Sequence, residues 1–405
     1  MTRCAGDAAR PRLSVALIVR DEQDVLSESL ASVRGIADEL VVLDTGSTDR
    51  TQAVAEQGGA AVSERAWDND FSAARNHCLG LLTGDWVLWL NAGERLDAAE
   101  AEPLRRFVEG QAERAAAYLL PVVVPPAAPG ASAEQVCQLR LLPAGAGLRF
   151  EGRVRETVRP SVERSGLRIE LAPGRIACHP RQHERARKER LAKRNLQLIA
   201  READQAADPP ARLLLAAGEA CADLGQDEEA REAFRGAVEA ADVGSTEMLE
   251  AYYGLLTAYD ADEQCGGEQV DVCLEALEIF PLDGQLLLAL GNYMLGRQRT
   301  DFAVKAFRAA VDLGQVNLEA WHLDELAEMA ASCLAVTLQG LGREEEARAA
   351  LEEALRVRPE SPRICQLLND SRLGDGRLDP REPGQVVPPL LPIVSQVSSA
   401  DATAP

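Results

Sequence analysis

Short apolar runs alternate with helical segments between residues 13 and 110, and this alternation constrains the fold more than any other feature. The first run, "LSVALIV" at Leu13–Val19, is continuously apolar, which is typical of a strand covered on both faces. Further runs predict strands at 39–44, 60–64 and 86–90, and helical spacing occurs at 22–33, 48–57 and 72–82. Strands that alternate with helices form right-handed βαβ units and a parallel sheet, in which ligands bind beyond the carboxyl ends of the strands.

From residue 115 to 180 the pattern changes to shorter apolar runs separated by Pro and Gly turns. These runs predict strands at 116–125, 136–142, 152–158 and 175–179. A basic helix is predicted at 184–201, and nine Lys or Arg residues lie between positions 175 and 201, against two Glu. This helix presents either a solvated charged face or a positive wall for an acidic ligand.

Residues 210 to about 365 carry a helical pattern in which small or apolar residues recur at fixed offsets. The pattern is typical of tetratricopeptide repeats, whose two antiparallel helices must pack closely. Three sets of positions fit it, namely Gly218, Cys221, Ala230, Phe234 and Ala237; Gly291, Met294, Ala303, Phe307 and Ala310; and Ala335, Leu338, Ala347, Leu351, Ala354 and Pro359. A weaker unit contains Cys273, Ala276 and Pro281. Stacked units of this kind form a concave surface that binds peptides or partner subunits.

The composition argues against several classes of protein. A net charge of −22 disfavours nucleic acid or an anionic membrane as a bulk partner. No apolar run approaches the roughly 20 residues of a transmembrane helix, and the N-terminal run is predicted to be a strand, not a signal peptide. The nine cysteines have no CxxC pair or zinc-ligand spacing, which favours reduced thiols in a cytoplasmic protein. Residues 371–405 hold six prolines without helical periodicity and are predicted to be a disordered tail.

Three segments place polar side chains at the same edge of the predicted sheet. In "VVLDTGSTDRT", Asp44 directly follows the second strand, where its carboxylate could accept hydrogen bonds from a base or a ribose. The alternative is a capped βα turn, in which Thr48 caps the next helix. In "FSAARN", Arg75 either makes a surface salt bridge or reaches a diphosphate through its forked guanidinium. The third segment, "DWVLWLNAGE", places Asn91 and Glu94 after the fourth strand.

Four motifs occur in order along the chain, namely "LSVALIVRDE", "VVLDTGSTDRT", "FSAARN" and "GDWVLWLNAGE". They closely resemble those of the family 2 inverting glycosyltransferases with the GT-A fold, in particular the subgroup fused to tetratricopeptide repeats. The resemblance covers roughly residues 13–200. It implies a nucleotide-sugar donor, usually UDP-linked, a divalent cation, and transfer to an acceptor hydroxyl, amide or thiol with inversion.

The resemblance assigns roles to the residues of the donor site. Asp44 corresponds to the family's nucleoside-binding acid, and Arg75 and Asn76 match its "ARN". Asn91 and Gly93 occupy the two acidic positions of the family's "DxD" motif. An amide at position 91 can still hydrogen-bond a ribose hydroxyl, whereas Gly93 offers no ligand.

The metal site that the family implies is therefore altered in this chain. Glu94 matches the acid that often follows the motif, and it is the first predicted metal ligand. His179 of "RIACHP" is the second, because the family has a late histidine near the metal and the diphosphate; its alternative is a structural role. Hard cations prefer carboxylate oxygens, so the loss of both aspartates is expected to weaken binding of Mn²⁺ or Mg²⁺.

Further along, "RLLPAGAGLRFEGRVRETV" resembles the family's "RLF…FEGRVHE" and places Glu156 where the catalytic base is expected. A carboxylate base must deprotonate the acceptor as it attacks the anomeric carbon. The family's preceding histidine is Arg155 here, and its guanidinium is expected to favour the ionised carboxylate. The alternative is that Glu156 is an exposed glutamate on a strand.

Together these features predict an α/β domain followed by an all-α domain. The first is a GT-A-like, Rossmann-type mixed sheet over residues 11–205, and the second is a tetratricopeptide-type α-solenoid over 210–368, followed by the tail at 371–405. The predicted function is a cytoplasmic glycosyltransferase that moves a sugar from a nucleotide-diphosphate sugar to an acceptor with inversion, while the repeats dock a protein acceptor or partner.

Two alternatives stay open. The first is a degenerate glycosyltransferase domain that acts as a scaffold or binding protein with little or no activity. The second is a nucleotidyltransferase of similar fold, which is disfavoured because the N-terminal part has no Gly-rich, Lys-containing phosphate loop.

Overall fold

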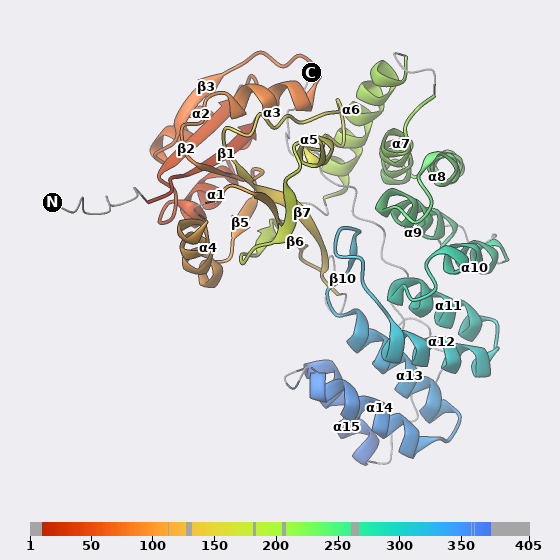
Figure 1. Cartoon of the computed structure of the whole chain (residues 1–405). Coiled ribbons are helices and arrows are strands. Elements are labelled where there is room, and N and C mark those ends of the chain that lie inside the picture. The colour runs from red at the N-terminus through yellow and green to blue at the C-terminus, as the bar shows by residue number, and fades with distance from the viewer. Residues whose placement is uncertain are drawn as a thin grey trace. The chain divides into compact units, whose positions relative to one another are not determined.

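The computed structural model describes residues 10–373, apart from 112, 127–131, 181–183, 205–207, 261–266, 358 and 360. These residues form two compact units, the first made of 10–125 and 136–208 and the second of 126–135 and 209–373. Figure 1 shows a mixed sheet with its helices in the first unit and a run of helices in the second, as predicted. The tail predicted at 371–405 lies outside the described residues beyond position 373.

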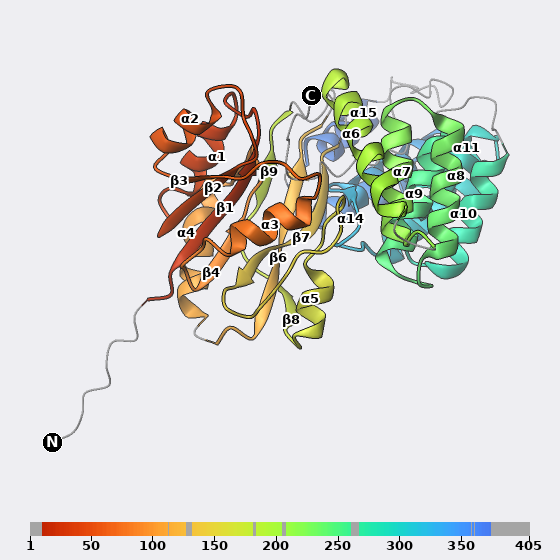
Figure 2. The ribbon, with the colours of Figure 1, turned by 90° about the horizontal axis from the view of Figure 1, so that it is seen from above.

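The N-terminal half of the first unit alternates strands and helices in the order β1 (Leu13–Val19), α1 (Leu26–Val33), β2 (Glu39–Asp44), α2 (Thr51–Gln57), β3 (Ala61–Glu64), α3 (Phe71–Leu79) and β4 (Trp86–Trp89). The strands pair in parallel in the order β3-β2-β1-β4. Every residue of β1 is buried, as expected for a strand covered on both faces. Right-handed connections put α1 and α2 on one face of these strands and α3 on the other (Figure 2).

The rest of the first unit continues the same sheet with β5 (Glu94–Leu96), α4 (Ala98–Gly110), β6 (Ala116–Val124), β7 (Glu134–Pro143), α5 (Arg159–Arg164), β8 (Arg168–Leu171), β9 (Ile176–Cys178) and α6 (Arg185–Ala203). Beyond β4 the strand order is β7-β6-β9-β5, and β8 pairs with β6. Because β7 runs antiparallel to β4, and β9 antiparallel to β5, the sheet is mixed.

The strand predicted at 152–158 is wrong. Residues 151–157 form a loop that is closed by two backbone hydrogen bonds between Glu151 and Thr157, with N–O distances of 2.9 and 3.0 Å. Inside the loop, Gly152 has φ 97° and Arg155 has φ 48°. A strand requires negative φ at each residue, so these two conformations turn the chain and end its extended course.

The helix after β2 also differs from its prediction. It begins at Thr51, whose backbone N donates to Oδ1 of Asp49 at 2.8 Å, and the side chain of the preceding Arg50 makes no capping hydrogen bond. Thr48 does not act as a helix cap; its backbone N instead donates to Oδ1 of Asp21, at 2.7 Å. The residues between Asp44 and the helix therefore form a separate turn, which hydrogen-bonds to Asp21 in the segment that follows β1.

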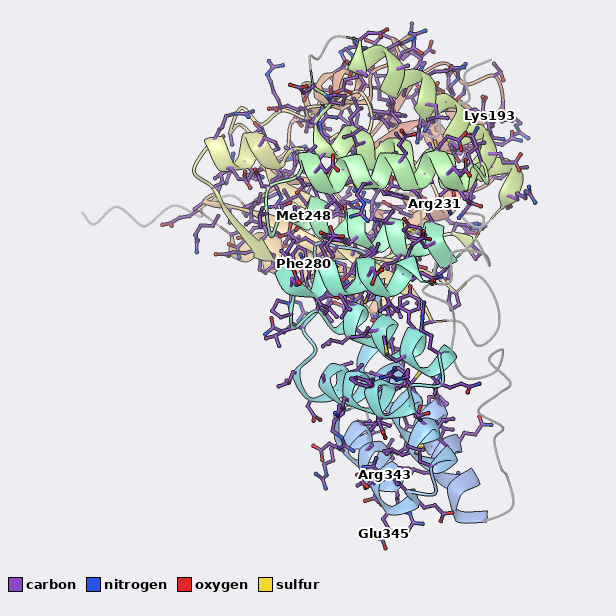
Figure 3. All side chains as sticks on the ribbon, turned by 90° about the vertical axis from the view of Figure 1, so that its right-hand side faces the viewer. Lys193, Arg231, Met248, Phe280, Arg343 and Glu345 are labelled. Carbon is purple, nitrogen blue, oxygen red and sulfur yellow. The ribbon has the colours of Figure 1, made fainter. Side chains whose placement is uncertain are left out.

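The second unit is a series of helices that pack in sequence, namely α7 (Ala211–Asp223), α8 (Asp227–Ala240), α9 (Thr246–Asp260), α10 (Glu268–Ile279), α11 (Gly284–Gly296), α12 (Thr300–Leu313), α13 (Leu326–Gly340), α14 (Glu344–Val357) and α15 (Pro362–Leu373). The glycines of the repeat pattern allow close packing. A Cβ atom at Gly218 would lie 2.6 Å from the ring of Phe234, and one at Gly291 would lie 2.3 Å from the ring of Phe307. Exposed side chains such as Arg343 and Glu345 cover the outside of these helices (Figure 3).

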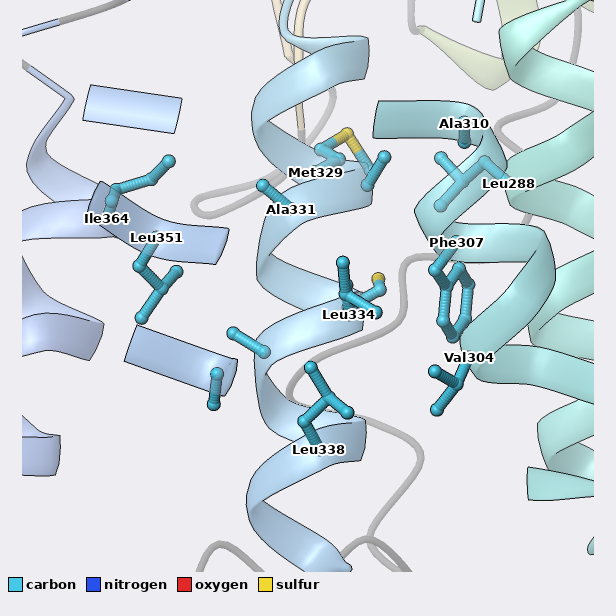
Figure 4. Close-up of a cluster of buried hydrophobic side chains, with 14 of the residues drawn as sticks. Leu288, Val304, Phe307, Ala310, Met329, Ala331, Leu334, Leu338, Leu351 and Ile364 are labelled. Atoms are coloured by element: carbon cyan, nitrogen blue, oxygen red, sulfur yellow. The ribbon is translucent and has the colours of Figure 1, made fainter. Parts of the chain in front are cut away.

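An apolar core joins the last five helices of the second unit, α11 to α15 (Figure 4). Phe307 of α12 packs in this core together with Leu338 of α13 and Leu351 of α14, and all three side chains are fully buried. Leu338 and Leu351 are repeat positions that the sequence predicts to be apolar. The fixed offsets in the sequence thus correspond to the buried face of each helix.

A short strand, β10 (His322–Leu323), precedes α13 and pairs antiparallel with Gln135 and Glu134. The Oγ of Ser132 donates to Sδ of Met329 in α13, at 2.9 Å. These contacts explain why residues 126–135 belong to the second unit. No helix in the described ranges is both long and apolar enough to cross a lipid bilayer.

Candidate donor and base site

Asp44 ends β2 with a completely buried carboxylate. Its Oδ1 accepts hydrogen bonds from the backbone N atoms of Gly46 and Ser47, both at 2.7 Å. Its Oδ2 is buried and has no hydrogen-bond partner among the described residues. A capped turn accounts for only one of the two oxygens. Because a buried, unsatisfied carboxylate oxygen is costly, the other oxygen is suited to accept a hydrogen bond from a bound molecule.

Asp21, at the end of β1, fixes the turn that follows Asp44. It lies in the left-handed region with φ 52°, and its Oδ1 accepts from N and Oγ1 of Thr48, at 2.7 and 3.2 Å. Its own backbone N donates to Oγ of Ser47, at 2.9 Å. Asp21 was not among the predicted site residues, although an acid two positions after the first strand lies at the same sheet edge as Asp44.

The turn after β4 is built on Asn91. Its backbone N donates to Oε2 of Glu94 at 2.8 Å, and its Nδ2 donates to Oε1 of the same residue at 2.9 Å. The amide oxygen, Oδ1, is buried and has no hydrogen-bond partner in the described part of the chain. Asp44 and Asn91 therefore each present an unsatisfied acceptor, at the carboxyl ends of the two strands that flank β1.

Glu94 does not face an open metal site, because it pairs with Arg140 of β7. The guanidinium binds both carboxylate oxygens, with Nη2–Oε1 at 2.7 Å and Nη1–Oε2 at 2.9 Å. Both side chains are nearly completely buried. The remaining donors of Arg140 bind Oε1 of Gln138 and the carbonyl oxygen of Trp89. Arg140 was not among the predicted site residues. Its signal in the sequence is an arginine inside the apolar run "QLRLL", since such a residue needs a buried partner.

The two predicted metal ligands, Glu94 and His179, are close together in the sheet. Cys178 pairs with Glu94, and the backbone N of His179 donates to the carbonyl oxygen of Gly93, at 2.8 Å. Their surroundings do not form a set of metal ligands: within the described ranges, no group of three or more His, Cys, Asp or Glu residues is arranged to hold a metal ion. The residues at the altered "DxD" position therefore do not fit a divalent cation.

Glu156 lies in the loop after β7 and faces Arg75 of α3. Nε of Arg75 is 2.7 Å from Oε1 of Glu156, and the two side chains are 8% and 3% exposed. The Arg75 guanidinium also lies 4.5 Å from the centre of the Trp89 ring and 4.9 Å from that of Phe150. Burial lowers the pKa of Arg75, and the charge of Glu156 acts in the opposite direction. The alternative of an exposed strand glutamate is wrong, and the salt bridge of Arg75 is buried, not on the surface.

Asn76 anchors the start of this loop. Its Nδ2 donates to the carbonyl oxygen of Phe150 at 2.9 Å, and its Oδ1 accepts from the backbone N of Phe150 at 2.8 Å. One helical turn earlier, the backbone N of Phe71 donates to the carbonyl oxygen of Arg153, at 3.2 Å. Helix α3 thus holds the loop of Glu156 at both of these points.

The basic helix α6 has two kinds of cationic residue. Lys193 is exposed to solvent (Figure 3), whereas Arg187 and Arg194 are buried. Arg194 lies over the ring of Phe71 at 4.8 Å. Burial lowers its pKa, and the charge of Glu156 raises it. The exposed Lys193 agrees with the predicted solvated face. The predicted positive wall for an acidic ligand stays a prediction, because the buried Arg194 faces Phe71 and the charge of Glu156.

Comparisons with known proteins agree with this organisation. Residues 14–118 match the family profile "Glycosyl transferase family 2", and residues 211–242 and 334–361 match "Tetratricopeptide repeat". A tetratricopeptide repeat-containing protein of Synechococcus elongatus is 52% identical over 89 residues, which is 22% of each chain. An uncharacterized glycosyltransferase of Rickettsia felis is 29% identical over 114 residues, which is 28% of this chain and 40% of that protein. The matches thus span less than half of these relatives.

Solved structures of both kinds are also similar to parts of the chain. A tetratricopeptide repeat protein of Thermus thermophilus is 19% identical with a TM-score of 0.32, and the match covers 45% of this chain and 91% of that one. Glucosyl-3-phosphoglycerate synthase of Mycobacterium tuberculosis, in complex with Mn²⁺, UDP and phosphoglyceric acid, is 22% identical with a TM-score of 0.23, over 29% and 43% of the two chains. The chain joins a glycosyl transferase family 2 segment, in its first unit, to tetratricopeptide repeats in its second.

Proposed function

We propose that the first unit transfers a sugar from a nucleotide-diphosphate sugar to an acceptor, with inversion at the anomeric carbon. The observation that carries the proposal is the pair of unsatisfied acceptors, Oδ2 of Asp44 and Oδ1 of Asn91. A nucleoside offers the complementary donors, because its base has N–H groups and its ribose has hydroxyls. In addition, α/β sheets bind such ligands beyond the carboxyl ends of their parallel strands.

Glu156 is the proposed catalytic base. It is a buried carboxylate held in one orientation, and such a group can take the proton of an acceptor that attacks the anomeric carbon. Attack on the donor in a single displacement inverts the configuration. Arg75 was predicted to reach the diphosphate, and Asn76 to belong to the donor site. We assign both instead to positioning, because Arg75 binds Glu156 and Asn76 binds the backbone of Phe150.

The repeats are proposed to dock a protein acceptor or a partner, since stacked repeats of this class form peptide-binding surfaces. A cytoplasmic location is proposed from the cysteines, which are free thiols at the seven described positions. The requirement for Mn²⁺ or Mg²⁺ that the family implies is not part of this proposal, because the residues at the motif do not fit such an ion.

A second candidate function is a scaffold that binds a nucleotide-sugar weakly or not at all. The observation in its favour is the same altered motif, in which Glu94 pairs with Arg140. The two candidates differ in turnover, since a scaffold releases no nucleoside diphosphate from any donor.

Titration calorimetry with a panel of UDP-, GDP-, CDP- and dTDP-sugars tests the donor site. We expect the full chain to bind one of them, and Asp44→Asn to weaken that binding because the amide cannot present the charged Oδ2. Asp24→Asn removes an exposed carboxylate from the segment between β1 and α1 and serves as the control. Equal affinity of Asp44→Asn and Asp24→Asn would place nucleotide binding elsewhere.

A further inference from the structure

We infer that this site binds its nucleotide diphosphate without a divalent cation, because a buried Glu94–Arg140 ion pair replaces the metal-binding part of the motif. The inference rests on the proposed function, since it concerns how the same donor is held. It follows from the hydrogen bonds that hold Glu94 and Arg140.

The carboxylate of Glu94 has no free lone pair for a metal. Its Oε1 accepts from Nη2 of Arg140 and Nδ2 of Asn91, and its Oε2 accepts from Nη1 of Arg140 and the backbone N of Asn91. A carboxylate offers about four lone-pair positions, and each is used here. A metal bond to either oxygen would displace a buried donor and leave it unsatisfied, which is costly.

Arg140 is not free to move aside either. Each nitrogen of its guanidinium donates to a defined acceptor: Glu94, Oε1 of Gln138 or the carbonyl oxygen of Trp89. Separating a buried ion pair leaves an uncompensated charge in a medium of low polarity, where the penalty is large. The pair is therefore a fixed and electrically neutral unit.

The other positions of the motif cannot compensate. Gly93 has no side chain, and Asn91 offers one neutral oxygen. Mg²⁺ in nucleotide sites is usually held by one or two carboxylates together with the phosphates, and Mn²⁺ favours the same oxygen ligands. Since this position supplies no available carboxylate, a cation here would have the diphosphate as its main ligand. Oδ1 of Asn91 is better suited to accept a hydrogen bond from a ribose hydroxyl.

The test is titration calorimetry of the full chain with UDP, GDP, CDP and dTDP, in EDTA and in Mn²⁺. We expect one nucleotide to bind with the same Kd in both buffers, to within about twofold. The inference is overturned if binding occurs only with Mn²⁺, or if Mn²⁺ tightens it about tenfold or more. Asp44→Asn should weaken the binding in both buffers, which assigns the signal to this site.

Binding of Mn²⁺ alone separates this inference from the proposed function. If no nucleotide binds in either buffer, the proposed donor site is wrong. Electron paramagnetic resonance then tests the motif directly, because bound Mn²⁺ loses the signal of the free ion. We expect the free-ion signal to persist with the wild-type chain. Loss of that signal with wild type, and its retention with Glu94→Gln, would show that Glu94 binds metal and would refute the inference.

Discussion

Nε of Arg75 lies 2.7 Å from Oε1 of Glu156, and the two residues come from elements separated by 81 positions in the sequence. The pair connects helix α3 to the loop that follows β7, and Trp89 and Phe150 cover the guanidinium. The orientation of the proposed base thus depends on packing between distant segments. This dependence makes Arg75 a positioning residue.

Replacing Arg75 by Met should destabilise the first unit by about 3–5 kcal/mol, because Glu156 would be left buried without its partner. The double variant Arg75→Met, Glu156→Leu should recover much of this loss, since both charges are removed together. Urea denaturation measures both changes. The exposed pair of Arg65 and Asp68 provides the control, and Arg65→Met should cost less than about 1 kcal/mol. Equal effects of Arg75→Met and Arg65→Met would contradict this account.

The Glu94–Arg140 pair should be sensitive to a change that keeps the charge. Arg140→Lys should cost about 1–3 kcal/mol, because an ammonium cannot make the two parallel hydrogen bonds or reach the acceptors on both sides. The matched control is Arg106→Lys, in an exposed ion pair with Glu102. Urea denaturation gives the free energy of unfolding of each variant, and the losses relative to wild type are then compared. A loss for Arg140→Lys no larger than that for Arg106→Lys would mean that the pair is not structurally important.

Packing in the repeats can be tested at Gly291. A Cβ atom there would lie 2.3 Å from the ring of Phe307, so Gly291→Ala should destabilise the second unit by about 1–3 kcal/mol through overpacking. The added change Phe307→Leu should relieve part of the clash. Gly296, in the same helix, has no atom within 4 Å of the corresponding position, and Gly296→Ala should be neutral or slightly stabilising. Thermal unfolding of the three variants checks these expectations.

The stability of the second unit should also depend on pH through the buried carboxyl group of Asp260. Burial raises the pKa of this carboxyl to about 6 from 3.8, although Tyr293 donates to it at 3.1 Å. In the unfolded chain the group ionises at its ordinary pKa, so the folded state binds more protons between about pH 4 and 6. Stability due to this residue is therefore highest below that window and falls as the pH rises through it.

Asp260→Asn removes the ionisable group, so the variant should not lose stability as the pH rises from about 4 to 6. Relative to wild type, the variant should gain about 1–2 kcal/mol between pH 4 and pH 7, allowing for solvent screening. Urea unfolding of both proteins across that range measures the gain. Asp271→Asn, at an exposed position of α10, should show no such gain. A stability difference between Asp260→Asn and wild type that does not change with pH would contradict the assignment.

The features that local sequence patterns encode were predicted correctly. Continuous burial of Leu13–Val19 follows from its unbroken apolar run, and the glycines at 218 and 291 follow from fixed repeat offsets. The loop at 151–157 could not be predicted in this way. The alternation of "GRVRETV" is compatible with a strand, whereas the left-handed conformation of Arg155 depends on the hydrogen bonds that close the loop.

The candidate site shows the same limit. Sequence motifs identify Asp44, Asn91 and Glu156, but they do not reveal which partner each side chain has. Arg140 and Glu94 are 46 positions apart, and only the pairing of strands brings them together. Because of that contact, the carboxylate of Glu94, which was predicted to bind a metal, forms an ion pair with Arg140.

Release of nucleoside diphosphate from the donor that binds, compared between wild type and Glu156→Gln, tests the central claim most directly. The glutamine keeps the size of the side chain but cannot accept the acceptor's proton. We expect wild type to turn the donor over, and Glu156→Gln to lose about 10²–10⁴-fold in rate while it still binds the donor. Turnover by Glu156→Gln at the wild-type rate, or no turnover by the wild-type chain of a donor that it binds, would contradict the proposed enzyme.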